Sequence, residues 1–288
     1  MTIHNFISLS CIHLVLSFTL SGLAFLFSAY FQIELSVDIP ITLGIALLAY
    51  ILVKNKHVYT QWQETQNLWK TLIRSTNYFI RQILEATWIK NSSLWEVSHV
   101  RTSLVYRHIS FLFALVATLR KNTDRKYQQY LSDIEIEIVQ RTSNKPYSIL
   151  KLQMSDFDTM RAKHVVDEAT FFLLTNKVIE FINTLDTFEY NANTLPKEFY
   201  FEERIYIWLL IVLVTISTLE PLQEWSVLVG IFIGCIFLTL QSFGKALLNP
   251  FDEKLNFFNI EKTVKDIEAN SIELLREKEI ADLMKDNR

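Results

Sequence analysis

Apolar residues dominate two stretches of the chain that contain no basic side chains. No Lys or Arg occurs in residues 1–53 or 205–244. The 26 residues from Phe6 to Phe31 also lack Asp and Glu, and a membrane-spanning helix needs roughly 20 such residues. Shorter apolar runs follow. The pattern predicts four transmembrane helices in two hairpins, with spans at approximately 6–31, 37–56, 203–220 and 224–244.

The segments that connect the paired spans carry acidic side chains and no basic ones. They are residues 32–40 and 220–224, with Glu34, Asp38, Glu220 and Glu224. Because basic residues concentrate on the cytoplasmic side, these segments are predicted to face outward. Both termini and the long middle region then lie in the cytoplasm. The spans lie in the cell membrane, that is, the plasma or inner membrane. A cleaved signal peptide is the competing interpretation of the first run, but that run is too long and lacks a basic leader.

The region between the two hairpins is predicted to be helical. Apolar residues recur at spacings of three and four across Val58–Leu84, Leu104–Leu119 and Ala169–Leu185. No Gly or Pro interrupts residues 54–145, so the second span is expected to continue into a long cytosolic helix. Residues 133–138 alternate like a strand but lie between helical neighbours, and we expect a helix there. The predicted fold is all-α, one 288-residue unit with cytosolic helices at 57–202 and 245–288.

Composition supports a chain that lies partly in lipid and partly in water. Half of the residues are hydrophobic and the mean hydropathy is +0.19, between the values of soluble and wholly membrane-embedded proteins. The net charge of −3 does not indicate a nucleic-acid partner.

Motifs of catalysis and of metal binding are missing from the sequence. It has no glycine-rich phosphate loop, paired-histidine zinc motif or nucleophile elbow, so we expect no enzyme, no cofactor and no metal. His164 and Glu168 are expected on a solvated helix face. Arg107-His108 is expected to make an interhelical polar contact. His13, an ionisable group within a span, either has a function or reaches the membrane interface.

Three segments resemble the bestrophin family of pentameric ion channels. The first runs from Leu43-Gly44-Ile45-Ala46 through Lys54-Asn55 to Tyr59, Trp62, Glu64, Leu68 and Trp69. The second comprises Asn144-Lys145-Pro146, Leu150, Glu189, Asn193-Thr194 and Tyr200. The third is Asn249-Pro250-Phe251-Asp252, directly after the fourth span, followed by Asp266–Asn270.

The resemblance implies a homopentamer in a lipid bilayer that conducts small ions passively. It places the pore neck at Ile45, Ala49 and Val53 and a cytosolic aperture near Asn191, Asn193 and Thr194. Animal members of the family bind calcium with a run of acids after Asn-Pro-Phe. Here the run stops at Asp252-Glu253 and turns basic at Lys254, so we expect no calcium clasp.

The proposed neck residues form one stripe because they lie at i, i+4 and i+8 of a helix. Such an apolar ring would control conduction by wetting and dewetting. The alternative is that the stripe packs between helices, with Leu48 and Leu52 as the seam. Below the stripe, Lys54, Lys56 and His57 put positive groups at the inner mouth, which favours chloride and other monovalent anions. A monovalent-cation channel, a non-conducting scaffold or regulator, and a membrane-bound enzyme remain alternatives.

Overall fold

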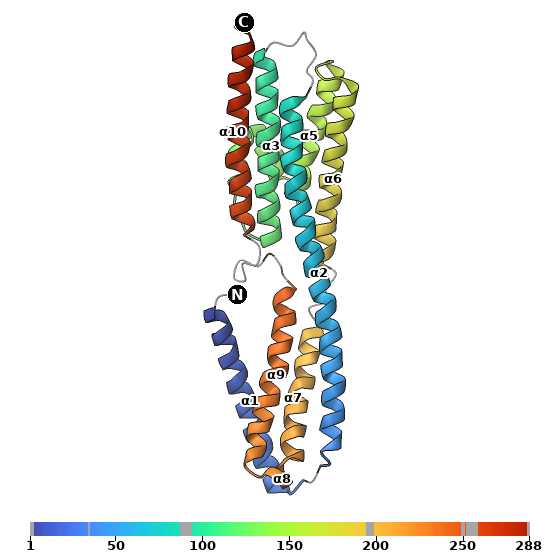
Figure 1. The fold of residues 1–288 in the computed structure, drawn as a ribbon, viewed down its shortest axis with the longest axis vertical. Coiled ribbons are helices and arrows are strands. Elements are labelled where there is room, and N and C mark those ends of the chain that lie inside the picture. Colours follow the sequence, from blue (N-terminus) through green and yellow to red (C-terminus); the bar gives the residue numbers. More distant parts are fainter. Residues whose placement is uncertain are drawn as a thin grey trace. The chain divides into compact units, whose positions relative to one another are not determined.

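Helices make up most of the residues that the structure describes. A computed structural model describes residues 3–33, 35–86, 94–193, 199–248, 251 and 259–286. Its elements are α1 (Ile3–Phe31), α2 (Asp38–Glu85), α3 (Leu94–Arg120), the short 3₁₀ helix η1 (Lys126–Tyr130), α4 (Asp133–Gln140), α5 (Lys145–Ala162), α6 (Glu168–Asn193), α7 (Phe199–Ser217), α8 (Leu219–Leu222), α9 (Trp225–Leu247) and α10 (Ile260–Asp286) (Figure 1). The all-α prediction is confirmed, including the helix at residues 133–138.

Contacts divide the chain into two compact units. Unit 1 consists of residues 1–65 and 191–257, and unit 2 of residues 66–190 and 258–288. Helix α2 contributes to both, because its 48 residues continue from the apolar run into the amphipathic run, as the sequence predicts. The prediction that spans and cytosolic helices form one body concerns the relation between the units and stays a prediction.

Small side chains let the helices of unit 1 approach one another closely. Helices α1, α7 and α9 contact each other. Gly230 of α9 lies against Ser21 of α1 and Thr215 of α7, and a Cβ atom there would overlap both hydroxyls. Gly234, one turn later, lies against Ser17 and Ile211 in the same way. Close approach through small residues is how helices associate in a membrane, where lipid tails remove the hydrophobic drive.

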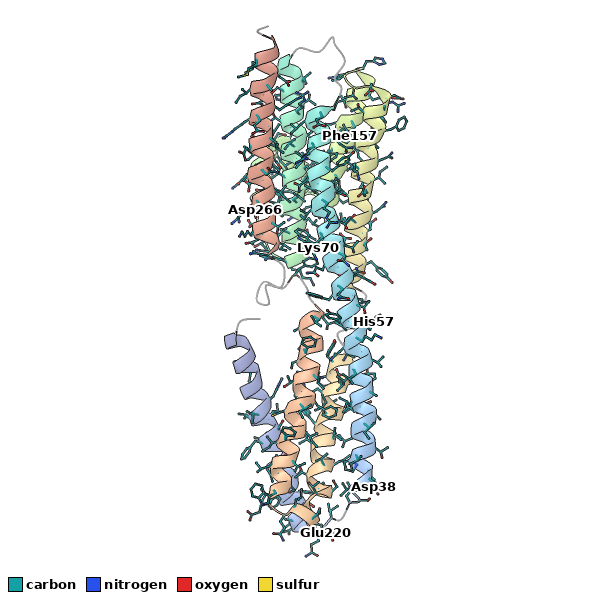
Figure 2. All side chains as sticks on the ribbon, viewed as in Figure 1. Asp38, His57, Lys70, Phe157, Glu220 and Asp266 are labelled. Atoms are coloured by element: carbon teal, nitrogen blue, oxygen red, sulfur yellow. The ribbon has the colours of Figure 1, made fainter. Side chains whose placement is uncertain are left out.

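An apolar cluster joins the first half of α2 to α7 and α9. Its buried members are Ile51, Ile207, Leu210, Ile211, Val214, Phe237 and Leu238. Asp38 begins α2, and it lies at the same end of unit 1 as Glu220 of α8 (Figure 2). The two acidic connections therefore share one end of unit 1.

Among the described residues, four helices are long and apolar enough to cross a membrane, and they differ from the predicted set at one place. They are α1 (over Ile12–Phe31), α2, α3 (over Val97–Arg120) and α9. Helix α7 is outside this set, and its first turns carry Glu202, Glu203 and Arg204. In α3, 61% of the most apolar stretch is buried, against 17–33% in the other three. Protein enclosure by α5, η1 and α10 accounts for the apolar character of α3. The predicted third span stays a prediction.

Unit 2 has an aromatic core around His108 of α3. This histidine is fully buried, and its Nε2 lies 3.2 Å from Thr76 Oγ1 of α2. The ring centroid of His108 is 4.9 Å from that of Phe79 and 4.8 Å from that of Phe181. The histidine therefore joins α2, α3 and α6, as an interhelical polar contact predicted from sequence.

Arg107 makes the second interhelical contact predicted for α3. Its guanidinium pairs with Glu135 of α4 and Asp156 of α5. Burial opposes ionisation of Glu135, but hydrogen bonds from Ser132 and the charge of Arg107 outweigh it and lower the pKa of that carboxyl. A buried arginine is thus neutralised by acids from two other helices.

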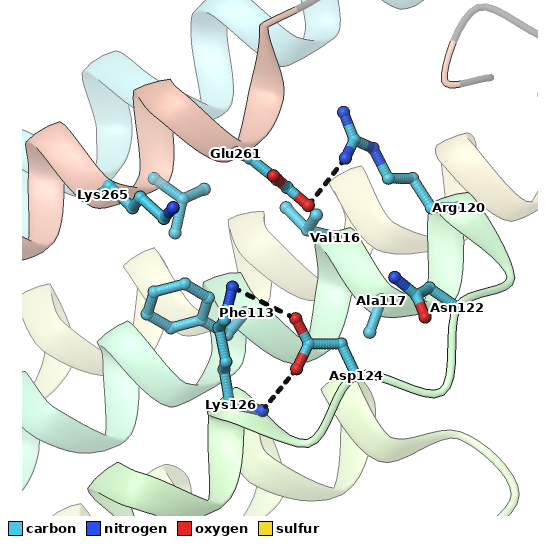
Figure 3. Close-up of a pocket in the computed structure, with 10 residues that line it drawn as sticks. Phe113, Val116, Ala117, Arg120, Asn122, Asp124, Lys126, Glu261 and Lys265 are labelled. Atoms are coloured by element: carbon cyan, nitrogen blue, oxygen red, sulfur yellow. Dashed lines mark hydrogen bonds and ion pairs between the residues drawn. The ribbon is translucent and has the colours of Figure 1, made fainter. Parts of the chain in front are cut away.

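Helix α10 docks on the basic and aromatic side chains of α3 and η1. Arg120 at the end of α3 pairs with Glu261 at 2.8 Å, and Asp124 in the following turn pairs with Lys126 (Figure 3). Two turns further along α10, Glu268 accepts a hydrogen bond from Tyr130. These contacts, with Val264 and Ile267 buried beneath them, tie the C-terminal helix to the body of unit 2.

The predicted helix face of His164 and Glu168 is wrong. His164 lies in the turn between α5 and α6 with φ of 52°, while Glu168 begins α6. Asp167 Oδ1 accepts a hydrogen bond from the Thr170 backbone N–H at 3.1 Å and so caps the start of α6. The turn was hidden from sequence because no Gly or Pro marks it.

Replacing Gly234 by valine should destabilise unit 1. The new Cβ would overlap Ser17 and Ile211, and overpacking of this kind costs typically about 1–3 kcal/mol. Gly22→Val is the matched control, since nothing lies within 4 Å of a Cβ at Gly22. Thermal unfolding of purified protein should show a lower midpoint for Gly234→Val alone. Equal midpoints for the two variants would contradict the packing of α9 on α1 and α7.

Acidification should destabilise unit 2 through His108. Burial lowers the pKa of His108 to about 3, against 6.5 for an unperturbed histidine. As pH falls below 6.5, the unfolded state binds a proton that the folded state refuses, so the free energy of unfolding drops by up to about 1.4 kcal/mol per pH unit. His108→Gln cannot titrate, and its midpoint of thermal unfolding should fall less between neutral and acid pH than that of the natural protein. The same fall in both proteins would show that His108 is not buried in its neutral form.

Candidate functional site

The first half of α2 has a packed face and an opposite, exposed face. Ile51, Asn55 and Val58 are buried on the packed face. Ile45 and Val53, exposed by 66% and 72%, lie on the other face with the exposed Ala49 between them. Because an α-helix turns through roughly 100° per residue, these two sets lie on opposite sides of the same cylinder. The predicted stripe therefore lies on the face of α2 opposite the packed one.

The alternative seam through Leu48 and Leu52 is only partly present within the chain. Leu48 packs with Leu47 against the apolar cluster that contains Ile51. Leu52 is 51% exposed and lies beside the stripe. Packing inside one chain thus uses the Leu48 side of α2 and leaves the stripe available to a lumen or to a second subunit.

The three residues expected at the inner mouth separate into two groups. Lys56 and His57 are exposed and continue the outward face beyond Val53. The His57 ring nitrogen Nε2 lies 3.3 Å from Gln61 Nε2, one turn along the helix. Lys54 points elsewhere, toward α7, where it forms an ion pair with Glu203. The structure therefore keeps Lys56 and His57 together and removes Lys54 from their group.

The Lys54 ammonium lies near one carboxylate and two aromatic rings. Its Nζ is 3.5 Å from the ring centroid of Tyr200 and 6.0 Å from that of Tyr50. Glu203, its partner, is 1% exposed. Sequence reasoning missed both Glu203 and Tyr200 as partners of Lys54. An acidic residue at the margin of a predicted span was the available signal, because such groups are paired when they lie in a membrane protein.

A second polar junction lies beside this ion pair. Asn55 Nδ2 donates a hydrogen bond of 2.8 Å to the Leu240 carbonyl, and Gln241 Nε2 donates one of 2.8 Å to the Tyr200 carbonyl. Gly244 leaves the space that the Asn55 side chain occupies. These contacts fasten α2 and α7 to α9 at the end of the bundle where the positive residues lie.

His13 is an interhelical contact and does not reach outward. It is 8% exposed, and its Nε2 lies 3.1 Å from Ser242 Oγ of α9. The choice between a function and a position at the membrane interface stays a prediction. The contact stabilises the pairing of α1 with α9.

The expected aperture residues are described only in part. Asn191 lies near the end of α6, and Asn193 is its last residue. Thr194 lies outside the described residues. Their role in an aperture stays a prediction.

The residues that carry the family resemblance have structural contacts where they are described. The rings of Tyr59 and Trp62 stack at 5.9 Å between centroids, while Glu64 is exposed. Trp69 packs on Phe188 of α6 at 6.5 Å. Phe251 is 5% exposed, and Asn249 and Pro250 lie outside the described residues, as do Asp252 and Glu253.

Metal chemistry finds no support in the described part of the chain. Among those residues, no group of three or more His, Cys, Asp or Glu side chains could hold a metal ion. What the site offers is an exposed apolar stripe that ends in exposed positive side chains, next to a buried ion pair. Such a surface can line a water-filled conduit or pack against another subunit.

Comparison with known proteins identifies relatives for almost the whole chain. The family model described as "Bacterial/Fungal Bestrophin protein" matches residues 3–273. Proteins from Salmonella typhi and Salmonella typhimurium, both called "Voltage-dependent anion channel-forming protein YneE", are 20% identical over 241 residues, which cover 83% of this chain and 76% of each relative.

Solved structures share the fold. The crystal structure of a bacterial bestrophin homolog from Klebsiella pneumoniae has a TM-score of 0.81 and 22% identity, and the match covers 92% of this chain and 98% of that one. A variant of the same homolog with an Asp-to-Ala mutation gives the same TM-score and identity.

Proposed function

Because the chain belongs to the bacterial and fungal bestrophin family, we propose that it is the pore-forming subunit of a homo-oligomeric channel that passes small anions passively. It is a membrane protein, and four helices of its described part are long and apolar enough to cross a membrane. The family is one of channels, so the prediction that the chain is not an enzyme is confirmed.

The exposed stripe on α2 carries this proposal. Ile45, Ala49 and Val53 point away from every helix that packs on α2 within unit 1, among the residues described. In a ring of subunits, five by the family resemblance, this face would surround the axis. Three stacked apolar rings would then form a neck that passes ions when it is wet and blocks them when it is dry.

Anions are the proposed cargo, chloride and other monovalent anions in particular. The Salmonella relatives are named as anion channels. Lys56 and His57 are exposed on the same side of α2, just beyond the neck. Positive groups at the mouth of a low-dielectric passage raise the local concentration of anions. A cation-selective pore and a non-conducting scaffold are the outcomes against which this is tested.

The proposed spans are α1, the first half of α2, α7 and α9. Helix α7 belongs to this set, despite its charged first turns, because it packs against both α1 and α9. Its Glu203 is neutralised by Lys54, which lowers the cost of bringing the acid to the membrane margin. The acidic end of unit 1, with Asp38 and Glu220, faces outward, and both termini lie in the cytoplasm of a cell whose inner or plasma membrane holds the channel.

Ala49 variants test the pore in planar-bilayer recordings of purified protein. Ala49→Phe should cut the current at least about tenfold, because a ring of aromatic side chains narrows and dewets the neck. Ala49→Ser should raise it, since a hydroxyl lowers the cost of wetting. Ala29→Phe is the matched control, an exposed alanine on α1, and should leave the current unchanged.

Size-exclusion chromatography on the same variants separates conduction from assembly. If the stripe packs between subunits, Ala49→Phe overpacks it, at a cost of typically about 1–3 kcal/mol, and the oligomer is lost. Unchanged current in both Ala49 variants with an intact oligomer would mean that the stripe does not line the pore. An intact natural protein without current would favour the scaffold. A reversal potential near the equilibrium potential of the cation would favour the cation channel.

Cysteine labelling tests the proposed topology in intact cells. Cysteines replacing Asp38 or Gln223, at the acidic end of unit 1, should react with a membrane-impermeant thiol reagent. A cysteine replacing Asn144, which caps α5 in unit 2, should react only after the cells are opened. Labelling of the Asn144 variant in intact cells would overturn the four-span arrangement.

A further inference from the structure

Lys54 follows Val53 directly in α2, yet its charge is held away from the exposed face. The ammonium forms an ion pair with Glu203 of α7 and lies over the Tyr200 ring, 3.5 Å from its centroid. The side chain of Lys54 is 15% exposed and that of Glu203 is 0% exposed. The pair is therefore largely shielded from water. Counter-ions in solution screen such a shielded pair only weakly.

Each partner depends on the other for neutrality. Glu203 Oε1 has no hydrogen-bond partner among the described residues, so Lys54, bound to Oε2, is the group that compensates the carboxylate there. Among the described residues, the Lys54 ammonium has no second carboxylate within an ion-pair distance of 4.0 Å. Removal of one partner from a buried pair leaves an uncompensated charge, whereas removal of both leaves none.

We propose that Glu203 is a selectivity-determining residue that acts through Lys54. It cancels a positive charge one residue beyond the neck, so that the positive potential at the inner mouth comes from Lys56. The inference rests on the proposed channel function, and it extends that function from the pore-lining helix to α7. Glu203 does not touch the permeant ion and is a positioning residue.

In a symmetric ring of subunits, the effect of losing Glu203 is repeated once in each subunit. Each subunit contributes one Lys54, so loss of Glu203 would free one positive charge per subunit at the same level of the pore. In a narrow neck, those charges lie within a Debye length of the lumen. Together they raise the local concentration of anions in the pore. Loss of Lys54 instead frees one negative charge per subunit, with the opposite effect.

Three variants test the proposal through the reversal potential in a potassium chloride gradient. Glu203→Gln should raise the anion-to-cation permeability ratio at least about twofold, and Lys54→Gln should lower it by a similar factor. The double variant should return to the natural ratio, because the intact pair contributes no net charge. Glu202→Gln is the matched control: it removes an acid from the adjacent, exposed position of α7 and should change the ratio less than Glu203→Gln.

Thermal unfolding of the same purified proteins measures the pair without any need for current. Each single variant should lower the midpoint, and the double variant should lower it by less than the sum of the two. Strict additivity would overturn the pairing. Unchanged permeability ratios in two conducting single variants would overturn the effect on selectivity.

If the protein is not a channel, the natural protein carries no current. That result overturns this inference as well and needs no variant to recognise it. Where a single variant does not assemble, the permeability ratios of the neutral double variant and of the exchanged pair K54E/E203K test the proposal instead. Natural permeability ratios in both support the proposal, and a shifted ratio in either overturns it.

Discussion

The unbroken helix α2 is the constraint on which the rest of the structure depends. It runs from Asp38 to Glu85, and each unit packs on a different part of it, through Ile51 in unit 1 and through Phe79 in unit 2. An α-helix fixes the angular position of every side chain, so the packing of Ile51, Asn55 and Val58 also fixes which residues point away. The exposure of the stripe from Ile45 to Val53 is a consequence of the packing on its opposite side.

Polar contacts near the end of unit 1 hold that packing in register. Lys54 with Glu203, Asn55 with the Leu240 carbonyl, and Gln241 with the Tyr200 carbonyl link α2, α7 and α9. Between apolar helices in lipid, shape alone specifies rotation weakly, whereas a hydrogen bond or ion pair has one good geometry. These contacts fix the rotation of α2 and with it the direction of the stripe. If the chain is the channel that we propose, selectivity and architecture depend on the same few side chains.

Unit 2 shows why apolar composition does not by itself identify a membrane helix. Helix α3 is as apolar as a span over Val97–Arg120, but it lies in a protein core that also buries Arg107 and His108. Both contact neighbouring helices: Arg107 pairs with two acids, and His108 Nε2 lies within hydrogen-bond distance of Thr76. Helix α7 is the opposite case. The charged residues in its first turns exclude it from the helices that are apolar enough to span a membrane, although it packs against α1 and α9.

Much of this protein could be predicted from its sequence, and the remainder depends on contacts between distant residues. The all-α fold, the continuous α2, the helix at residues 133–138 and the stripe at Ile45, Ala49 and Val53 follow from local periodicity, which needs only neighbours in the chain. The turn at His164 was missed because no local signal marks it. The partner of Lys54 lies 149 residues away in sequence, and the sequence therefore grouped that lysine with Lys56 and His57. Whether a charge is free or compensated is set by the residue that packs against it, and only the tertiary structure decides which residue that is.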